Sequence, residues 1–280
     1  MSGSGSSSSA YRTFTVVLAA LAATALALSG CSPSDKQQQG GSFTLLSTTQ
    51  VRGGSSMPNT LIAVDSASGA QRSVGEVGAT AEQASLTWDA SAGVLYGVSA
   101  ATSRTIVRID AATGATTVVT QLAHDALAVA ASPAGNLYVL LGERLFFTSW
   151  LLATVDPSSG VLSVIGQVPI ATAGYAYTFL AGMDFQSDGT LYAVADQREA
   201  ANFNTNVYHL LTIDPATAAV TSSLPIEDSH AIGDIACAPD GLIYATNWSW
   251  HLIRIDPRTG RNVGVGLGQL GALGGLATKR

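Results

Sequence analysis

One ten-residue phrase recurs five times in this 280-residue chain and constrains the fold more than any other feature. The copies read LIAVDSASGA from Leu61, IVRIDAATGA from Ile106, LATVDPSSGV from Leu152, LLTIDPATAA from Leu210 and LIRIDPRTGR from Leu252. Each copy alternates apolar and polar residues up to an aspartate and then enters a corner rich in Pro, Ser, Thr and Gly. This pattern predicts a strand, a tight turn and a second strand. The aspartates are Asp65, Asp110, Asp156, Asp214 and Asp256, separated by 45, 46, 58 and 42 residues.

A second phrase recurs between these copies and completes the repeating unit. It reads SLTWDASAGVLYGV from Ser85, LAVAASPAGNLYVL from Leu127, GMDFQSDGTLYAV from Gly182 and DIACAPDGLIYAT from Asp234. Its tyrosines fall at equivalent places, namely Tyr96, Tyr138, Tyr192 and Tyr244. We therefore expect each unit to contain an inner strand a, a turn, strand b, a loop, strand c, a corner and an outer strand d. Four short strands at a period near 45 residues are typical of β-propeller blades.

The two ends of the repeat region predict how the ring closes. The first unit begins with FTLLSTT from Phe43, which aligns with strand b, so this unit has no strand a of its own. The last unit is followed by a spare strand a, LGGLAT from Leu273. Joining the two completes one blade and removes open sheet edges, which are sites of aberrant pairing. The sequence therefore predicts an all-β propeller of five four-stranded blades over residues 43–280, closed by a blade made from both termini.

The Asp-x-x-Thr-Gly corners have a structural explanation. The carboxylate of each repeated aspartate can accept hydrogen bonds from the backbone N–H groups that follow it, and glycine supplies a positive φ. The fourth copy departs from the pattern, with Ala218 where the others have glycine. Calcium binding at the corners is an alternative, but the motif lacks a second carboxylate.

These phrases resemble those of the bacterial NHL/YVTN-like propellers. The family phrase GLAxxPDGxLYVAD…IxxIDPxTG appears almost verbatim at Ile232–Gly260, and the resemblance extends from Phe43 to Thr278. It implies the propeller fold and leaves the function open, because one architecture supports many sites.

The N-terminal segment is predicted to be a lipoprotein signal. A polar stretch with one cation, Arg12, precedes the apolar run FTVVLAALAATALALSGC, which is shorter than the roughly 20 residues of a spanning helix. Its last four residues, Leu28–Cys31, resemble a bacterial lipobox. In that family the signal is cut before the cysteine, which then carries diacylglycerol. We expect a signal peptide over residues 1–30 and lipid on Cys31; an ordinary signal peptide with an incidental cysteine is the alternative.

The Ser, Gln and Gly residues that follow predict a flexible tether over residues 31–42. By the same resemblance, Ser32 favours sorting to the outer membrane on its periplasmic side. We therefore expect a protein of the cell envelope, attached to a membrane through its N-terminal lipid.

Composition and cysteine content exclude several classes of function. A formal charge of −6 and the absence of a basic stripe argue against nucleic-acid binding. With Cys31 lipidated, Cys237 is left alone, which excludes a disulfide framework and predicts a small buried apolar residue. The chain has no Ser-His-Asp pattern, no phosphate-binding glycine loop before a helix and no haem motif. We expect a monomer without a cofactor.

The connections of the predicted propeller differ between its two faces. The a–b and c–d turns are short and regular, whereas the b–c and d–a connections, on the other face, are long and aromatic. Such a surface on a rigid scaffold predicts a binding module for a protein, peptide or glycan. Candidate contacts are Phe147, Trp150, Tyr175, Tyr177, Arg198, Trp248 and Trp250. The alternative for each aromatic residue is packing between blades.

A second hypothesis is a metal-assisted hydrolase or lyase. The residues His124, Asp125, Asp228 and His230 lie in d–a connections that lead toward the axis, where a His/Asp ring could hold a metal. An ion on the axis would favour the enzyme, and a wide aromatic face without an ion would favour the binding module. A purely structural envelope module is the third hypothesis.

Overall fold

The computed structural model describes residues 42–50, 59–77, 83–99, 104–142, 150–169, 175–199, 202–227, 232–247, 251–267 and 272–280. All of these residues belong to one compact unit, Gly40–Arg280. Every regular element in these ranges is a β-strand. None of the described residues forms a helix with the length and apolar character that crossing a membrane requires. Residues 1–41, with the predicted signal peptide, Cys31 and the tether, lie outside the described ranges, so these assignments stay predictions.

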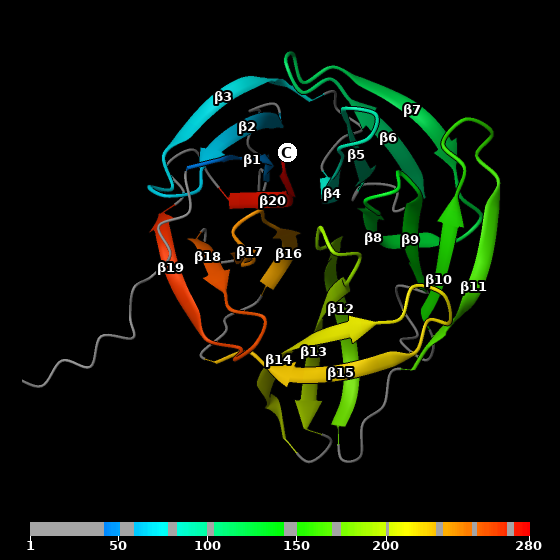
Figure 1. Cartoon of the computed structure of the whole chain (residues 1–280), viewed down its shortest axis with the longest axis vertical. Coiled ribbons are helices and arrows are strands. Elements are labelled where there is room, and N and C mark those ends of the chain that lie inside the picture. The colour runs from blue at the N-terminus through cyan, green and yellow to red at the C-terminus, as the bar shows by residue number, and fades with distance from the viewer. Residues whose placement is uncertain are drawn as a thin grey trace, which may run out of the picture. The chain divides into compact units, whose positions relative to one another are not determined.

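Five four-stranded antiparallel sheets stand around a common axis, which confirms the predicted five-bladed propeller (Figure 1). From the axis outward, blade A contains β20 (Ala272–Thr278), β1 (Thr44–Gln50), β2 (Thr60–Asp65) and β3 (Gln71–Glu76). Blade B contains β4 (Gln83–Asp89), β5 (Val94–Ser99), β6 (Thr105–Ile109) and β7 (Thr116–Gln121).

The other three blades follow the same order from the axis outward. Blade C contains β8 (Asp125–Ala131), β9 (Leu137–Gly142), β10 (Trp150–Val155) and β11 (Leu162–Val168). Blade D contains β12 (Tyr175–Phe185), β13 (Leu191–Glu199), β14 (Asn202–Ile213) and β15 (Val220–Pro225). Blade E contains β16 (Ile232–Cys237), β17 (Ile243–Asn247), β18 (His251–Ile255) and β19 (Asn262–Leu267).

Blade A is built from both ends of the repeat region, as predicted. The C-terminal strand β20 lies antiparallel to β1, with Ala277 opposite Leu46 and Thr278 opposite Leu45 (Figure 1). The pairing continues past the strand, because the amide of Lys279 donates to the carbonyl of Thr44 at 3.1 Å. The ring is therefore closed by backbone hydrogen bonds rather than by side-chain packing alone.

The inner strands form a continuous ring, because β4, β8, β12, β16 and β20 each contact the next in that order. Close approach demands small side chains here. A Cβ built on Gly182 would collide with the Asp234 carboxylate and lie 2.8 Å from the Asp234 Cα atom, and one on Gly275 would lie 2.8 Å from the Leu86 amide nitrogen. The alanines and glycines of the inner strands are thus required by the distance between blades.

The spaces between blades hold the hydrophobic core. Between blades C and D, for example, Leu140 and Trp150 pack in one cluster with Phe185 and Leu191. Burying a large apolar side chain stabilises a fold by roughly 1.5–3 kcal/mol. Five clusters of this kind connect the blades. Cys237 lies in one of them and is fully buried, as predicted.

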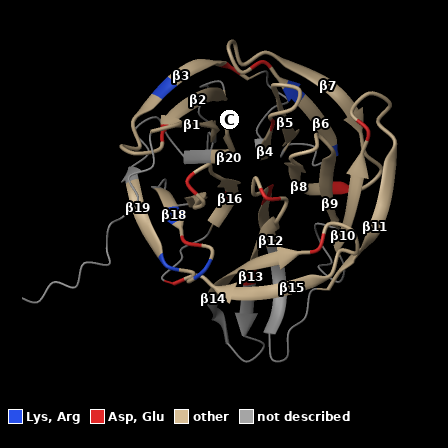
Figure 2. Cartoon of the chain, in the orientation of Figure 1, with Lys and Arg blue, Asp and Glu red and all other residues tan. Residues whose placement is uncertain are grey.

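The corner turns have the predicted chemistry. In blade B the Asp110 carboxylate accepts from the amides of Ala112 at 2.8 Å and Thr113 at 2.9 Å, and Gly114 has φ +80°. The other corner aspartates accept in the same way. Ala218 takes the glycine conformation with φ +62°, the only non-glycine residue with positive φ among those described. Figure 2 shows the acidic residues recurring at such turns of an otherwise sparsely charged ring.

Blade D differs from the sequence-based expectation. The segment around Arg198, expected to be a long b–c connection, is largely strand, because β13 continues to Glu199 and β14 begins at Asn202. Strand β12 likewise begins at Tyr175, inside a predicted d–a loop. These three strands have 11, 9 and 12 residues, whereas all the others have 5 to 7. Backbone pairing between neighbouring strands extends this sheet past the length of the repeat.

Candidate functional site

The extended part of blade D brings three predicted contact residues together. In the β12–β13 ladder, Tyr175 is opposite Glu199, Ala176 is opposite Arg198 and Tyr177 is opposite Gln197. On the other side of β13, Arg198 is opposite Asn206 of β14. The structure describes these residues by their backbone only. The backbones of Tyr175, Tyr177 and Arg198 are therefore neighbours in one three-stranded ladder, which we call the blade D extension (175–179, 196–199 and 202–208).

Trp150, another predicted contact, lies in the core. It begins β10, where it is opposite Gly142 and Val168, and its side chain is only 1% exposed. Gly142 makes room for the indole, because a Cβ at Gly142 would lie 2.9 Å from the Trp150 Cδ1 atom. In the described structure Trp150 packs between blades C and D, which is the alternative that the sequence left open for each aromatic residue. Phe147, Trp248 and Trp250 lie outside the described residues.

Of the predicted axial metal ligands, His124 and Asp125 lie in the described ranges, at the start of β8. The Asp125 carboxylate forms an ion pair with Arg104, whose Nε atom is 2.8 Å from Oδ1. This ion pair connects blades B and C and engages one carboxylate oxygen of Asp125, which the sequence suggested as a metal ligand. Asp228 and His230 lie outside the described ranges. Within the described part of the chain, no three His, Cys, Asp or Glu side chains are grouped so that they could hold a metal ion.

Two buried carboxyl groups near the axis were not predicted from the sequence. The inner-strand residues opposite the repeated tyrosines are Thr87, Ala130, Asp184 and Ala236. Two residues earlier in the same strands come Ser85, Ala128, Gly182 and Asp234. Each of these two sets of four residues, which we call levels, therefore contains one aspartate and one serine or threonine. The other members of each level are alanine or glycine.

Asp234 joins three blades through its carboxylate. Its Oδ2 atom accepts from the amides of Leu276 in blade A at 2.7 Å and Leu86 in blade B at 3.0 Å, and Oδ1 lies 3.3 Å from the Ser85 hydroxyl. The side chain is completely buried. Burial raises the pKa of Asp234 well above its usual value, despite the amides that stabilise the charged form. The Asp234 carboxylate therefore connects the inner strands of three blades, because it accepts hydrogen bonds from backbone amides of two neighbouring blades.

Asp184 performs the same task one level away. Its Oδ2 atom accepts from the amide of Cys237 in blade E at 2.7 Å. Burial raises the pKa of Asp184 to about 6, and the nearby Arg280 guanidinium opposes that rise. Arg280 Nη2 itself donates to the carbonyls of Phe185 and Cys237, both at 2.9 Å. A carboxylate among the small residues of an inner strand, as in GMDF and DIAC, is the sequence signal that points to this network.

No protein-family model and no curated protein sequence matches the chain. By contrast, 640 chains of solved structures match its fold, so the architecture is common and does not select a function. One of these is TolB from Acinetobacter baumannii, with 14% sequence identity and a TM-score of 0.49. The match covers 85% of this chain and 66% of the TolB chain. At that identity the likeness concerns the fold alone. The described part of the chain is thus a five-bladed propeller of four-stranded sheets, closed by pairing β1 with β20.

Proposed function

We propose that this protein is a lipid-anchored binding module of the cell envelope. In this proposal its partner, a protein, peptide or glycan, docks on the face that carries the b–c and d–a connections. The observation that carries the proposal is the blade D extension, whose strands β12, β13 and β14 run past the length of every other strand. The other four blades fill the ring with short strands only, so ring closure does not require the extra length.

The extension suits a binding platform for a physical reason. Backbone pairing across three strands already restricts the chain, so binding a partner does not cost the conformational entropy of ordering a loop. The extension carries Tyr175, Tyr177 and Arg198 on adjacent strands. Tyrosine and arginine are enriched among residues that dominate interface energies, where a single truncation costs roughly 2 kcal/mol or more.

The lipid anchor supports the cellular part of the proposal. Leu28–Cys31 resembles a lipobox, and the polar residues after Cys31, among which Asp35 and Lys36 are charged, would separate the lipid from the first strand, β1. A tether of this composition lets a rigid ring sample a volume near the membrane surface. The anchor would hold the module in the envelope, on the periplasmic side of the outer membrane.

The anchor is tested by metabolic labelling with a palmitate analogue. Wild-type protein should be labelled and the Cys31→Ser variant should not. Equal labelling of the two proteins would exclude lipid on this cysteine and would contradict the proposed membrane anchor. It would not bear on the proposed binding face, which is tested separately.

The binding face is tested by site-specific photo-crosslinking in membranes that contain the full-length protein. A crosslinking residue replaces either Gln197, in the extension, or Thr259, in a corner turn on the opposite face. We expect a discrete adduct from position 197 and none from position 259. The adduct should weaken in the folded variants Tyr177→Ala and Arg198→Ala but persist in Thr259→Ala. Adducts from the corner position alone would place the partner on the other face.

A further inference from the structure

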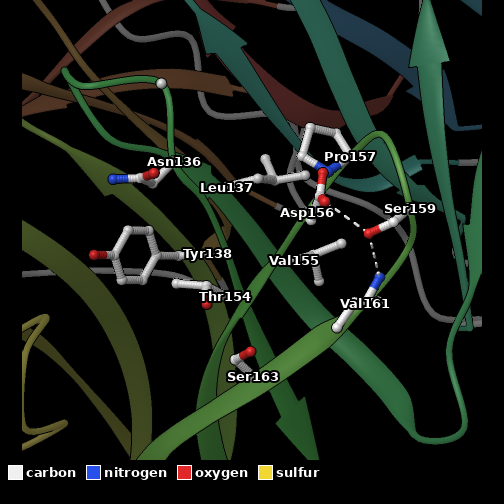
Figure 3. A pocket seen from close by; sticks show the side chains of 11 residues that line it. Asn136, Leu137, Tyr138, Thr154, Val155, Asp156, Pro157, Ser159, Val161 and Ser163 are labelled. Atoms are coloured by element: carbon white, nitrogen blue, oxygen red, sulfur yellow. Dashed lines mark hydrogen bonds between the residues drawn. The ribbon is translucent and has the colours of Figure 1, made fainter.

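We propose that a hollow on the outer part of blade C binds a neutral sugar ring. The cavity has a volume of about 640 Å³ and lies beside the a–b turn and the c–d corner of this blade (Figure 3). Small-molecule sites usually have volumes of roughly 300–1,000 Å³. The hollow is on the corner side of the ring, so it is a separate site from the binding face proposed above and does not depend on it.

A short residue of the repeat lies beside the hollow, although blade D also has a threonine at this place, Thr212 opposite Tyr192, so the threonine by itself does not determine where the hollow forms. In blades B and E, the strand c residue opposite the repeated tyrosine is an arginine, Arg108 opposite Tyr96 and Arg254 opposite Tyr244. The positive charge of Arg254 opposes the rise in the pKa of Tyr244 that burial causes. In blade C the equivalent residue is Thr154, opposite Tyr138. A threonine is several atoms shorter than an arginine, so the space beside Tyr138 stays open.

The polar groups around this space have unused hydrogen-bonding capacity. Figure 3 shows Asn136, Tyr138, Thr154 and Ser163 around the hollow. Within the described residues, no hydrogen bond of the Asn136 side-chain amide or of the Tyr138, Thr154 and Ser163 hydroxyls is found. Hydroxyl and amide groups both donate and accept, which is the complement of the hydroxyls on a sugar.

The charge of the site argues against an anionic ligand. The acidic side chain that lines it, Asp156, is already satisfied, because it accepts from the Ser158 hydroxyl at 2.7 Å and the Ser159 hydroxyl at 2.6 Å. The serine hydroxyls hold the pKa of Asp156 at about 2, so it stays ionised and occupied. No lysine or arginine lines the hollow, so an anion would meet no opposite charge.

The aromatic ring supplies the apolar half of the site. Tyr138 is half-buried, and its ring is held by Phe185 of blade D, with centroids 5.0 Å apart and planes inclined at 59°. A ring fixed in this way loses little conformational entropy on binding. The C–H face of a pyranose is apolar while its rim is polar, so one face can lie against Tyr138 while the rim meets the hydroxyls and the amide. Pro157 and Val161 add apolar surface.

The test uses methyl β-D-glucopyranoside as the probe and saturation-transfer NMR on the full-length protein. Thr154→Arg places in blade C the residue that blades B and E already accommodate, so the variant should fold and fill the hollow. Thr212→Arg is the matched control, since Thr212 is opposite Tyr192 in blade D. We expect transfer to the sugar in wild type and in Thr212→Arg, with apparent affinity weakened roughly tenfold or more in Thr154→Arg.

Two outcomes would overturn the proposal: no transfer to the sugar at millimolar concentration in wild type, or equal transfer in Thr154→Arg and wild type. If Thr154→Arg melts at a much lower temperature, Asn136→Ala replaces it, because this side chain is exposed at a turn and lies outside the core clusters. Unchanged transfer in a folded Asn136→Ala variant would then contradict the proposed site. A charged sugar acid that binds better than the neutral glucoside would contradict the proposed ligand class.

Discussion

At the scale of single residues, the ring depends on a few polar and conformational requirements. Each corner needs a carboxylate that accepts following amides and a residue with positive φ. Near the axis, the buried carboxyl groups of Asp184 and Asp234 accept hydrogen bonds from backbone amides of neighbouring blades. The two groups of aspartates look alike in sequence and differ in environment, so their pKa values move in opposite directions.

The corner glycines should not tolerate a side chain. In Gly260→Ala the new methyl group would take φ near +73° and collide with the Pro225 carbonyl. The left-handed conformation alone costs roughly 1–2 kcal/mol. We expect urea denaturation to show at least this loss in the free energy of unfolding.

Ala218→Gly is the matched reverse change, and we expect it to be nearly neutral. Relief of the left-handed conformation gains roughly 1–2 kcal/mol. Glycine loses roughly 0.5–1 kcal/mol through chain entropy, and removal of the fully buried methyl costs about 0.8 kcal/mol. These terms offset one another. A strong destabilisation of Ala218→Gly, or a neutral Gly260→Ala, would show that the corner conformation is not what the glycines provide.

The buried Asp184 should make stability fall as pH rises from about 4 to about 6. Its folded-state pKa, about 6, is above the ordinary value of 3.8, so its favourable contribution is present below the ordinary pKa. That contribution is lost as pH rises through the folded-state value. Asp184→Asn, which keeps an acceptor for the Cys237 amide, should flatten the dependence by about 1–3 kcal/mol. Melting temperatures across this pH range measure it, and an unchanged slope would mean that Asp184 does not titrate there.

At the scale of elements, the repeat sets strand length except in blade D. The inner strands are held at small separations, whereas β12, β13 and β14 extend beyond the shared ring. The core clusters contain Leu180 of β12, Ala195 of β13 and Tyr208 of β14, so the packed core reaches at least to these residues of blade D.

Replacing residues 198–206 with a two-residue Asn-Gly turn should leave the ring folded, because Gln197 and Val207 then remain opposite each other on either side of the turn. Asn-Gly suits a tight hairpin, and the cross-strand pairs nearer the core are kept. We expect a melting temperature within a few degrees of wild type, because the core contacts remain, and loss of the crosslinked partner. A steep fall in melting temperature would instead assign the extension a structural role.

At the scale of the whole molecule, closure makes the five blades one cooperative unit. Blade A has three strands from the N-terminal side and one from the C-terminal side, and Asp234 and Arg280 hold the inner strands of other blades in place. Removal of one inner strand therefore affects both neighbouring core clusters.

Deleting residues 273–280 should abolish cooperative melting or cause aggregation. The deletion exposes the edge of β1 and removes Leu276 and Ala277, which are fully buried. One large apolar side chain is worth roughly 1.5–3 kcal/mol, a large part of a typical net stability of about 5–15 kcal/mol. Differential scanning calorimetry measures the result. A truncated protein that melts like wild type would show that the closing strand is dispensable.

The repeat, the strand order, the corner chemistry and the closing strand could all be predicted from the amino-acid sequence. These features depend on contacts between residues close in sequence, such as Asp110 with Ala112, or on the regular alternation of apolar and polar residues along each repeat. Tertiary structure decided the rest. Asp234 meets Leu86 across 148 residues of sequence, and the Asn-rich stretch after Glu199 became strand through its neighbours rather than its own alternation. The hollow beside Tyr138 lies where Thr154 replaces the arginine found in blades B and E. Whether a carboxylate is buried, a strand extended or a space left open depends on what surrounds a residue, and that is set by blades distant in sequence.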